Sequence, residues 1–242
     1  MDYLTIFSSV LLAALIHASF NLSVSVLTLL SGHTLSREKS QIRLVKLLFA
    51  FTFGAIIMNI LLFCAFAFFA QTIFFDGIYL FIWLVLIGLL VGTGLAVWLF
   101  YYRRSSTNKS GTEIWIPRGI AKYLNDRARK TKHSAEAFSL GLTSIISEII
   151  FIFAPLLAAT FATIQLPSHL QVVAVLLYAF ISSLPTIVIA CLICGGHSIA
   201  QIQVWREKNK RFFQFCSGLG LLILAGFLYA SVVSPVVIGG SI

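Results

Sequence analysis

The residue most able to do chemistry is a single carboxylate, Glu148, which lies near the middle of the apolar segment 137–160. At ~1.5 Å of rise per helical residue, this position is about halfway across a hydrocarbon core of ~30 Å. An ionisable group there costs roughly 3 kcal/mol on insertion scales, so we expect Glu148 to face a bundle interior or an aqueous cavity. A low-dielectric site favours the neutral acid, which suits reversible protonation coupled to a solute or a cation. The alternative is a protonated glutamate that only joins neighbouring helices.

Other polar residues occur inside other apolar segments. His17 and Asn21 share a helix face because they are four residues apart, and Asn59 interrupts a further segment. Pro155 and Pro185 each remove a backbone donor, and the carbonyl that loses its partner must find a neighbour, a water or a ligand. We therefore expect a substrate or ion site formed by Glu148, His17, Asn21, Asn59, Ser144, Pro155, Ser183 and Pro185. Imidazole titrates near physiological pH, so His17 could pair with Glu148, although taken alone it fits a structural role better.

The four cysteines, Cys64, Cys191, Cys194 and Cys216, lie within or at the ends of apolar segments. A secreted disulfide framework would place them in exposed loops, so that class is excluded. Cys191 and Cys194 are three residues apart, and with Cys216 they could form a redox pair or a soft-metal site. The alternative is that they are small apolar residues of spanning helices.

Familiar catalytic and nucleotide-binding motifs are missing from the sequence. It contains no GxxxxGK[ST] loop, no HExxH and no GxSxG, which are the usual signatures of nucleotide, zinc and acyl-transfer sites. We expect no enzyme and no cofactor, and the sequence leaves any metal unknown. The basic loops also lack the folded modules of nucleic-acid-binding proteins, so no nucleic acid is expected as a partner.

The composition indicates a protein that resides in the lipid bilayer. The chain is 59% hydrophobic and 10% charged, against ~25% charged in soluble domains. Apolar windows of about 20 residues, the length of a membrane span, occur at 3–30, 44–70, 78–101, 137–162, 170–194 and 212–237. We predict an all-α, polytopic integral membrane protein with six transmembrane helices.

The net charge of +9 comes from 17 lysines and arginines in three clusters, at residues 37–46, 103–132 and 206–211. These clusters fall in the first, third and fifth connections, on one side of a six-helix chain. The positive-inside rule makes them cytoplasmic in a bacterial-type inner membrane, with both termini outside. The 103–132 loop is expected to include a short amphipathic helix after Pro117, which could contact anionic lipid or a protein partner; the alternative is a solvated connector.

The chain divides into residues 1–101, a first three-helix half, residues 102–136, a basic linker, and residues 137–242, a second half. Within the third apolar segment, Gly88 and Gly92 form a small-xxx-small pair, which is expected to admit a neighbouring helix closely.

This arrangement of helices resembles the lysine-exporter (LysE) superfamily. The second half carries the resemblance best, with EAFSLGLTSIISE entering the fourth helix and FCSGLGLLILAGFLY in the sixth. The resemblance implies a six-helix transporter built on an inverted three-plus-three repeat. Its redox branch, which includes CcdA and the membrane part of DsbD, is expected to have a cysteine in the first helix of each half, whereas 3–30 and 137–162 contain none.

Three functions follow as hypotheses. The leading one is a secondary transporter, an exporter of a small polar or ionic solute coupled to protonation or cation binding at Glu148. The second is a membrane thiol-disulfide redox protein that acts through Cys191, Cys194 and Cys216. The third is a non-catalytic membrane partner or scaffold that docks through the 103–132 loop.

Overall fold

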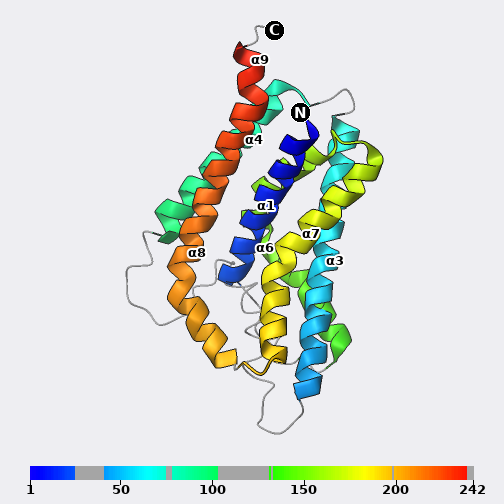
Figure 1. Cartoon of the computed structure of the whole chain (residues 1–242), viewed down its shortest axis with the longest axis vertical. Helices are drawn as coiled ribbons and strands as arrows, with labels where there is room; N and C mark the ends of the chain where they lie inside the picture. The colour runs from blue at the N-terminus through cyan, green and yellow to red at the C-terminus, as the bar shows by residue number, and fades with distance from the viewer. Residues whose placement is uncertain (25–40, 75–77, 103–130, 132, 198, 239–242) are drawn as a thin grey trace.

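The computed structural model describes residues 1–24, 41–74, 78–102, 131, 133–197 and 199–238 (Figure 1). The helices are α1 (Tyr3–Val24), α3 (Gln41–Ile73), α4 (Leu80–Ala96), α6 (Ser134–Thr163), α7 (Ser168–Cys194), α8 (Ile199–Leu228) and α9 (Ser234–Ile238), with π-helical turns η1 (Val97–Tyr102) and η3 (Tyr229–Val233). Six of the helical segments are long and apolar enough to cross a membrane. The expected all-α, six-helix, multi-pass fold is therefore confirmed for the part of the chain described.

The sixth apolar segment lies where the sequence indicated, at Arg211–Ile238, but the helix that carries it begins much earlier. The basic cluster 206–211 was expected in a loop, but it belongs to α8, which starts at Ile199. No glycine or proline occurs between Ile199 and Ser217, and glutamine, glutamate, lysine and arginine are good helix formers. The helix therefore continues beyond its apolar part.

The second basic cluster, at 103–132, falls almost entirely outside the described residues, and the first, at 37–46, is described only from residue 41, where α3 begins. Residues 25–40 and 103–130 are not described. The amphipathic helix expected after Pro117, and the docking of lipid or protein by the 103–132 loop, therefore concern a part of the chain on which the structure gives no information.

Helix α1 lies at the centre of the bundle (Figure 1). It packs against α6, α7 and α8, while α3 packs against α6 and α7, and α4 packs against α8. The main contacts therefore run between helices of the first half of the chain and helices of the second half.

Helices α3 and α6 run parallel and cross at two glycines. Ring contacts pair Phe53 with Phe138, Phe66 with Phe153 and Phe74 with Phe161, in the same order along both helices. A Cβ on Gly54 would overlap the Phe138 carbonyl oxygen, and a Cβ on Gly141 would overlap that of Phe51. The two backbones can approach so closely only because these side chains are absent.

The glycine pair that the sequence indicated does not make such a contact. A Cβ added to Gly88 or to Gly92 would have no atom of a neighbouring helix within 4 Å in the described part of the chain. In the same helix, Gly94 instead lies against Gly218 of α8, where an added Cβ would be 3.1 Å from the Gly218 carbonyl oxygen. The expectation for Gly88 and Gly92 was therefore wrong, and the close contact of this helix forms at Gly94, two residues after Gly92.

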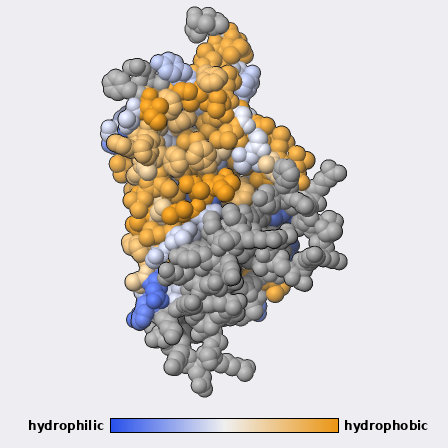
Figure 2. Space-filling model, turned by 180° about the vertical axis from the view of Figure 1, so that it is seen from behind, coloured by the Kyte–Doolittle hydropathy of each residue, from blue (hydrophilic) through white to orange (hydrophobic). Residues whose placement is uncertain are grey.

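The outer surface is largely apolar. Figure 2 shows a broad hydrophobic face over the upper part of the molecule, with hydrophilic residues toward its lower edge. Large side chains such as Phe68, Phe81 and Phe180 are more than half exposed on α3, α4 and α7. A soluble protein rarely exposes so extensive an apolar surface. The exposed side chains lie on helices that are long enough to cross a bilayer, as expected of a surface that faces lipid.

Candidate functional site

Glu148 lies at the middle of α6 and inside the bundle. Its side chain is 2% exposed, so it is not directed at lipid. Ile145 and Ile152, one turn before and one turn after it, pack in one cluster with Ala55 of α3. Residues 145, 148 and 152 share a helix face, so Glu148 lies on the side of α6 that meets α3. Its Oε2 atom has no hydrogen-bond partner, which is exceptional for a buried polar atom.

Asn59 of α3 lies at the same level as Glu148. The two helices are parallel, and Ala55, one turn before Asn59, packs with Ile145, one turn before Glu148. Asn59 is 1% exposed, and its Nδ2 donates to the hydroxyl oxygens of Ser182 and Ser183 on α7, at 3.1 Å each. The amide oxygen, Oδ1, has no partner.

The two polar residues of α1 bind α7 rather than α6. His17 Nδ1 is 3.0 Å from the Tyr178 hydroxyl, and Asn21 Nδ2 donates to the Ser182 carbonyl at 3.4 Å. Because these pairs follow the same order in both helices, α1 and α7 run parallel. The pairing of His17 with Glu148 that the sequence allowed is not formed here; the partner of His17 is Tyr178.

A stacked aromatic pair lies between the levels of His17 and Glu148. The rings of Phe20 on α1 and Phe151 on α6 have centroids 5.7 Å apart at an interplanar angle of 26°. α6 leads into α7 by a short turn and is therefore antiparallel to α7 and to α1. His17 and Glu148 each precede their phenylalanine by one turn, so they lie on opposite sides of the stacked pair along the bundle.

The remaining expected site residues, Ser144, Pro155 and Pro185, are all buried within α6 and α7. Ser144 is buried, but its hydroxyl donates to the Gly141 carbonyl of its own helix at 2.8 Å. Pro155 and Pro185 are buried inside α6 and α7, and both helices continue through them. The structure thus brings Asn21, Asn59 and Ser183 together at the Ser182 turn and holds His17 on the far side of the stacked rings. Glu148 lies near the level of Asn59 on the adjoining helix.

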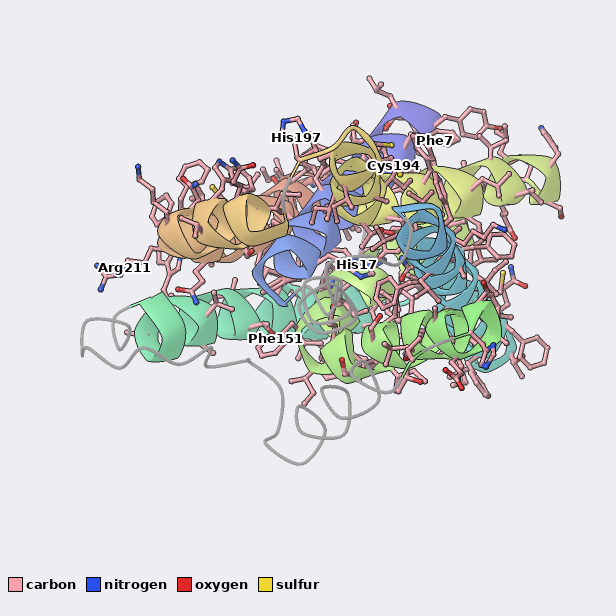
Figure 3. The ribbon with its side chains drawn as sticks, turned by 90° about the horizontal axis from the view of Figure 1, so that it is seen from below. Phe7, His17, Phe151, Cys194, His197 and Arg211 are labelled. Carbon is pink, nitrogen blue, oxygen red and sulfur yellow. The ribbon has the colours of Figure 1, made fainter. Side chains whose placement is uncertain are left out.

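The cysteines lie apart from this region. All four are thiols; Cys64, Cys191 and Cys194 are exposed, and Cys216 is half-buried. Seen from below, His17 lies near the middle of the bundle, whereas His197 and Arg211 lie toward its edge (Figure 3). No group of three metal-ligating side chains occurs among the described residues.

Sequence reasoning missed Tyr178 and Gln214, and it left Ser182, the neighbour of Ser183, out of the expected site. Tyr178, Ser182 and Pro185 are four and three residues apart, so they share one face of a helix. The positions of the hydroxyl residues could therefore have predicted the polar face of α7. Gln214 is 2% exposed and its Oε1 has no partner. It lies one turn from Ser217, whose hydroxyl is 2.7 Å from that of Ser19 on α1, so Gln214 is on the face of α8 that carries this contact.

Comparisons of the chain with protein-family models, with curated proteins and with solved structures found no match.

Proposed function

We propose that the protein is a secondary transporter, an exporter of a small polar or ionic solute, with Glu148 as the site of coupled protonation or cation binding. The observation that carries this proposal is a carboxylate 2% exposed at the centre of an apolar bundle, with Oε2 unpartnered. Ionisable residues in such positions typically belong to proton relays and ion pathways.

The helices around the site support the proposal. Asn59 and Glu148 lie on helices that contact each other. α7 contains a buried proline, Pro185, near this level, and α6 contains a buried proline, Pro155, two turns beyond Glu148. Discontinuous or proline-interrupted helices beside a midplane polar site are typical of secondary transporters. Helices α6 and α7 would then flex at Pro155 and Pro185 as the site changes its access.

The packing pattern supports two halves related by inversion. In such an arrangement α1 corresponds to α6, α3 to α7, and α4 to α8. The contact of α1 with α7 then corresponds to that of α6 with α3, and the contact of α1 with α8 to that of α6 with α4; all four contacts are present. When Phe20 is set against Phe151, every buried residue of α6 from Ala137 to Ile152 falls on a buried residue of α1, and Glu148 falls on His17. An inverted repeat with its site between the halves fits the lysine-exporter resemblance.

The proposal includes an orientation in the inner membrane. The lysine and arginine clusters place the first, third and fifth connections in the cytoplasm and both termini outside. Labelling of single cysteines near the ends of the spans by a membrane-impermeant thiol reagent tests this orientation. Labelling of the basic connections from outside intact cells would reverse it.

The transport role is tested in proteoliposomes that contain an entrapped pH-sensitive dye. Gradients of sodium, potassium, alanine and lysine are imposed in turn, and we expect at least one of them to drive proton movement through the wild type. Glu148→Gln should abolish that movement. Glu136→Gln is the matched control, because Glu136 is an exposed residue at the start of the same helix.

Two results would contradict the proposal. One is proton movement through Glu148→Gln at the wild-type rate. The other is a wild type that moves no protons with any of the four probes.

The redox alternative remains a separate proposal with its own test. It is favoured by one observation, the exposure of both Cys191 and Cys194 at one end of α7. Thiol trapping in cells grown under oxidising and reducing conditions should then show a change in their oxidation state. An unchanged thiol content in both conditions would exclude this function.

A further inference from the structure

The amide group of Asn59 has a defined orientation, because its hydrogen-bond partners fix which end faces α7. The Ser182 hydroxyl donates its single hydrogen to the Ala179 carbonyl at 3.2 Å. Toward Asn59, the Ser182 oxygen can therefore only accept. The amide nitrogen must face the two serines, and the amide oxygen must face away from them.

Oδ1 of Asn59 and Oε2 of Glu148 are both buried, lie near the same level of the bundle and have no hydrogen-bond partner. A protonated carboxyl group has one O–H donor, which is what an amide oxygen requires. An ionised carboxylate only accepts, and it would leave both oxygens unsatisfied. The orientation of Asn59 in this structure is therefore the one that suits the acid form of Glu148.

We propose that Asn59 is a positioning residue that reports the protonation state of Glu148 to α7. In the acid state, Asn59 Oδ1 accepts a hydrogen bond from the carboxyl group. When Glu148 releases its proton to water or to the solute, the amide rotates by half a turn, so that Nδ2 faces the carboxylate and Oδ1 faces Ser182 and Ser183. No covalent bond other than the O–H bond of Glu148 changes.

The rotation has a consequence for α7. To donate to Asn59 Oδ1, the Ser182 hydroxyl must leave the Ala179 carbonyl, so hydrogen bonding changes in the turn that precedes Pro185. That proline already deprives the Ile181 carbonyl of its usual donor. Helices bend where such bonds are missing, and Asn21 links the same turn to α1 through the Ser182 carbonyl.

Few other ionisable groups face Glu148 from the described parts of the packed helices. α1 contributes His17, which lies beyond the Phe20–Phe151 pair and binds Tyr178 of α7. On α3, Lys46 and Cys64 are both exposed. On α4, the residues from Leu80 to Ala96 include no ionisable side chain. A change in protonation at this level is therefore expected to belong to Glu148.

This inference rests on the proposed role of Glu148 as the proton site, and infrared spectroscopy of the reconstituted full chain separates the two. The carboxyl C=O band of Glu148 is assigned by its loss in Glu148→Gln, and its intensity is followed against pH. Ser182→Ala with Ser183→Ala removes both acceptors that hold the amide nitrogen. The nitrogen is then available to the carboxylate, and the band should disappear at a pH lower by about one unit or more.

A double-mutant cycle identifies Asn59 as the link. In an Asn59→Leu background, the same two serine substitutions should leave the pH dependence of the band unchanged. The matched control is Ser139→Ala with Thr143→Ala, which removes two hydroxyls from α6, at an exposed serine and at a threonine that donates to the carbonyl of that serine, and should not move the band. If the double serine variant does not fold, Ser182→Ala alone is used, with the same direction expected.

Each outcome decides between the two proposals. A serine effect that persists in the Asn59→Leu background, or no serine effect at all, overturns the role of Asn59 while Glu148 remains the proton site. A Glu148 band that never changes with pH overturns both.

Discussion

The crossing of α3 and α6 is predicted to tolerate no side chain at Gly141. The added Cβ of Gly141→Ala would overlap the Phe51 carbonyl oxygen and lie 3.0 Å from the Ala55 nitrogen. Both contacts are with backbone, which cannot move aside without separating the two helices along the face that carries Asn59 and Glu148. Overpacking usually costs ~1–3 kcal/mol, and we expect about 3 kcal/mol here.

Thermal unfolding in detergent micelles measures this effect, with Gly88→Ala as the matched control. Gly88 is also a helical glycine of an apolar segment, but an added Cβ meets nothing within 4 Å. Because alanine is favoured over glycine in helices by about 1 kcal/mol, the control should be unchanged or more stable. If Gly141→Ala unfolded at the temperature of Gly88→Ala, the close packing of α3 on α6 would be wrong.

Two further predictions concern single contacts. Tyr178→Phe removes the hydroxyl that binds His17 and leaves a buried imidazole nitrogen without a partner, so the free energy of unfolding should fall by ~1–3 kcal/mol. The control Tyr229→Phe, at an exposed tyrosine, should change it by less than about 0.5 kcal/mol. Equal effects of the two substitutions would contradict the account. The added Cβ of Gly218→Ala would overlap the Trp98 ring, which stacks on the Phe215 ring with centroids 5.5 Å apart. Since a side chain can move where backbone cannot, we expect a smaller loss of stability than for Gly141→Ala, together with a changed tryptophan fluorescence spectrum. An unchanged spectrum would show that Trp98 is not displaced.

The number of helices was predictable because membrane spans require long apolar windows, and those windows are unambiguous in this chain. The burial of Glu148 was predictable for the related reason that a carboxylate is unfavourable against lipid. Helix ends were less predictable. The start of α8 at Ile199 was missed because a basic cluster indicates a position outside the membrane but does not show whether that position is helical.

The partners of the polar residues were not predictable, because the sequence of one helix does not show which neighbour each face meets. Spacing alone indicated a close contact at Gly88 and Gly92, whereas the close contacts form at Gly54 and Gly141. In the same way, Asn59 could be recognised as a buried polar residue, but its binding to Ser182 and Ser183 depends on α3 and α7 lying side by side.

The most direct test of the central claim is the reaction of Glu148 with a lipophilic carbodiimide, which modifies protonated carboxyl groups in apolar surroundings. Labelled protein from membranes is digested, and the modified residues are identified by mass spectrometry across a range of pH. We expect Glu148 to be modified, less so as the pH rises, and to be protected by the solute that drives proton movement. Labelling of Glu148 that is absent, or that is the same at every pH, would contradict a buried carboxyl group that takes up and releases a proton.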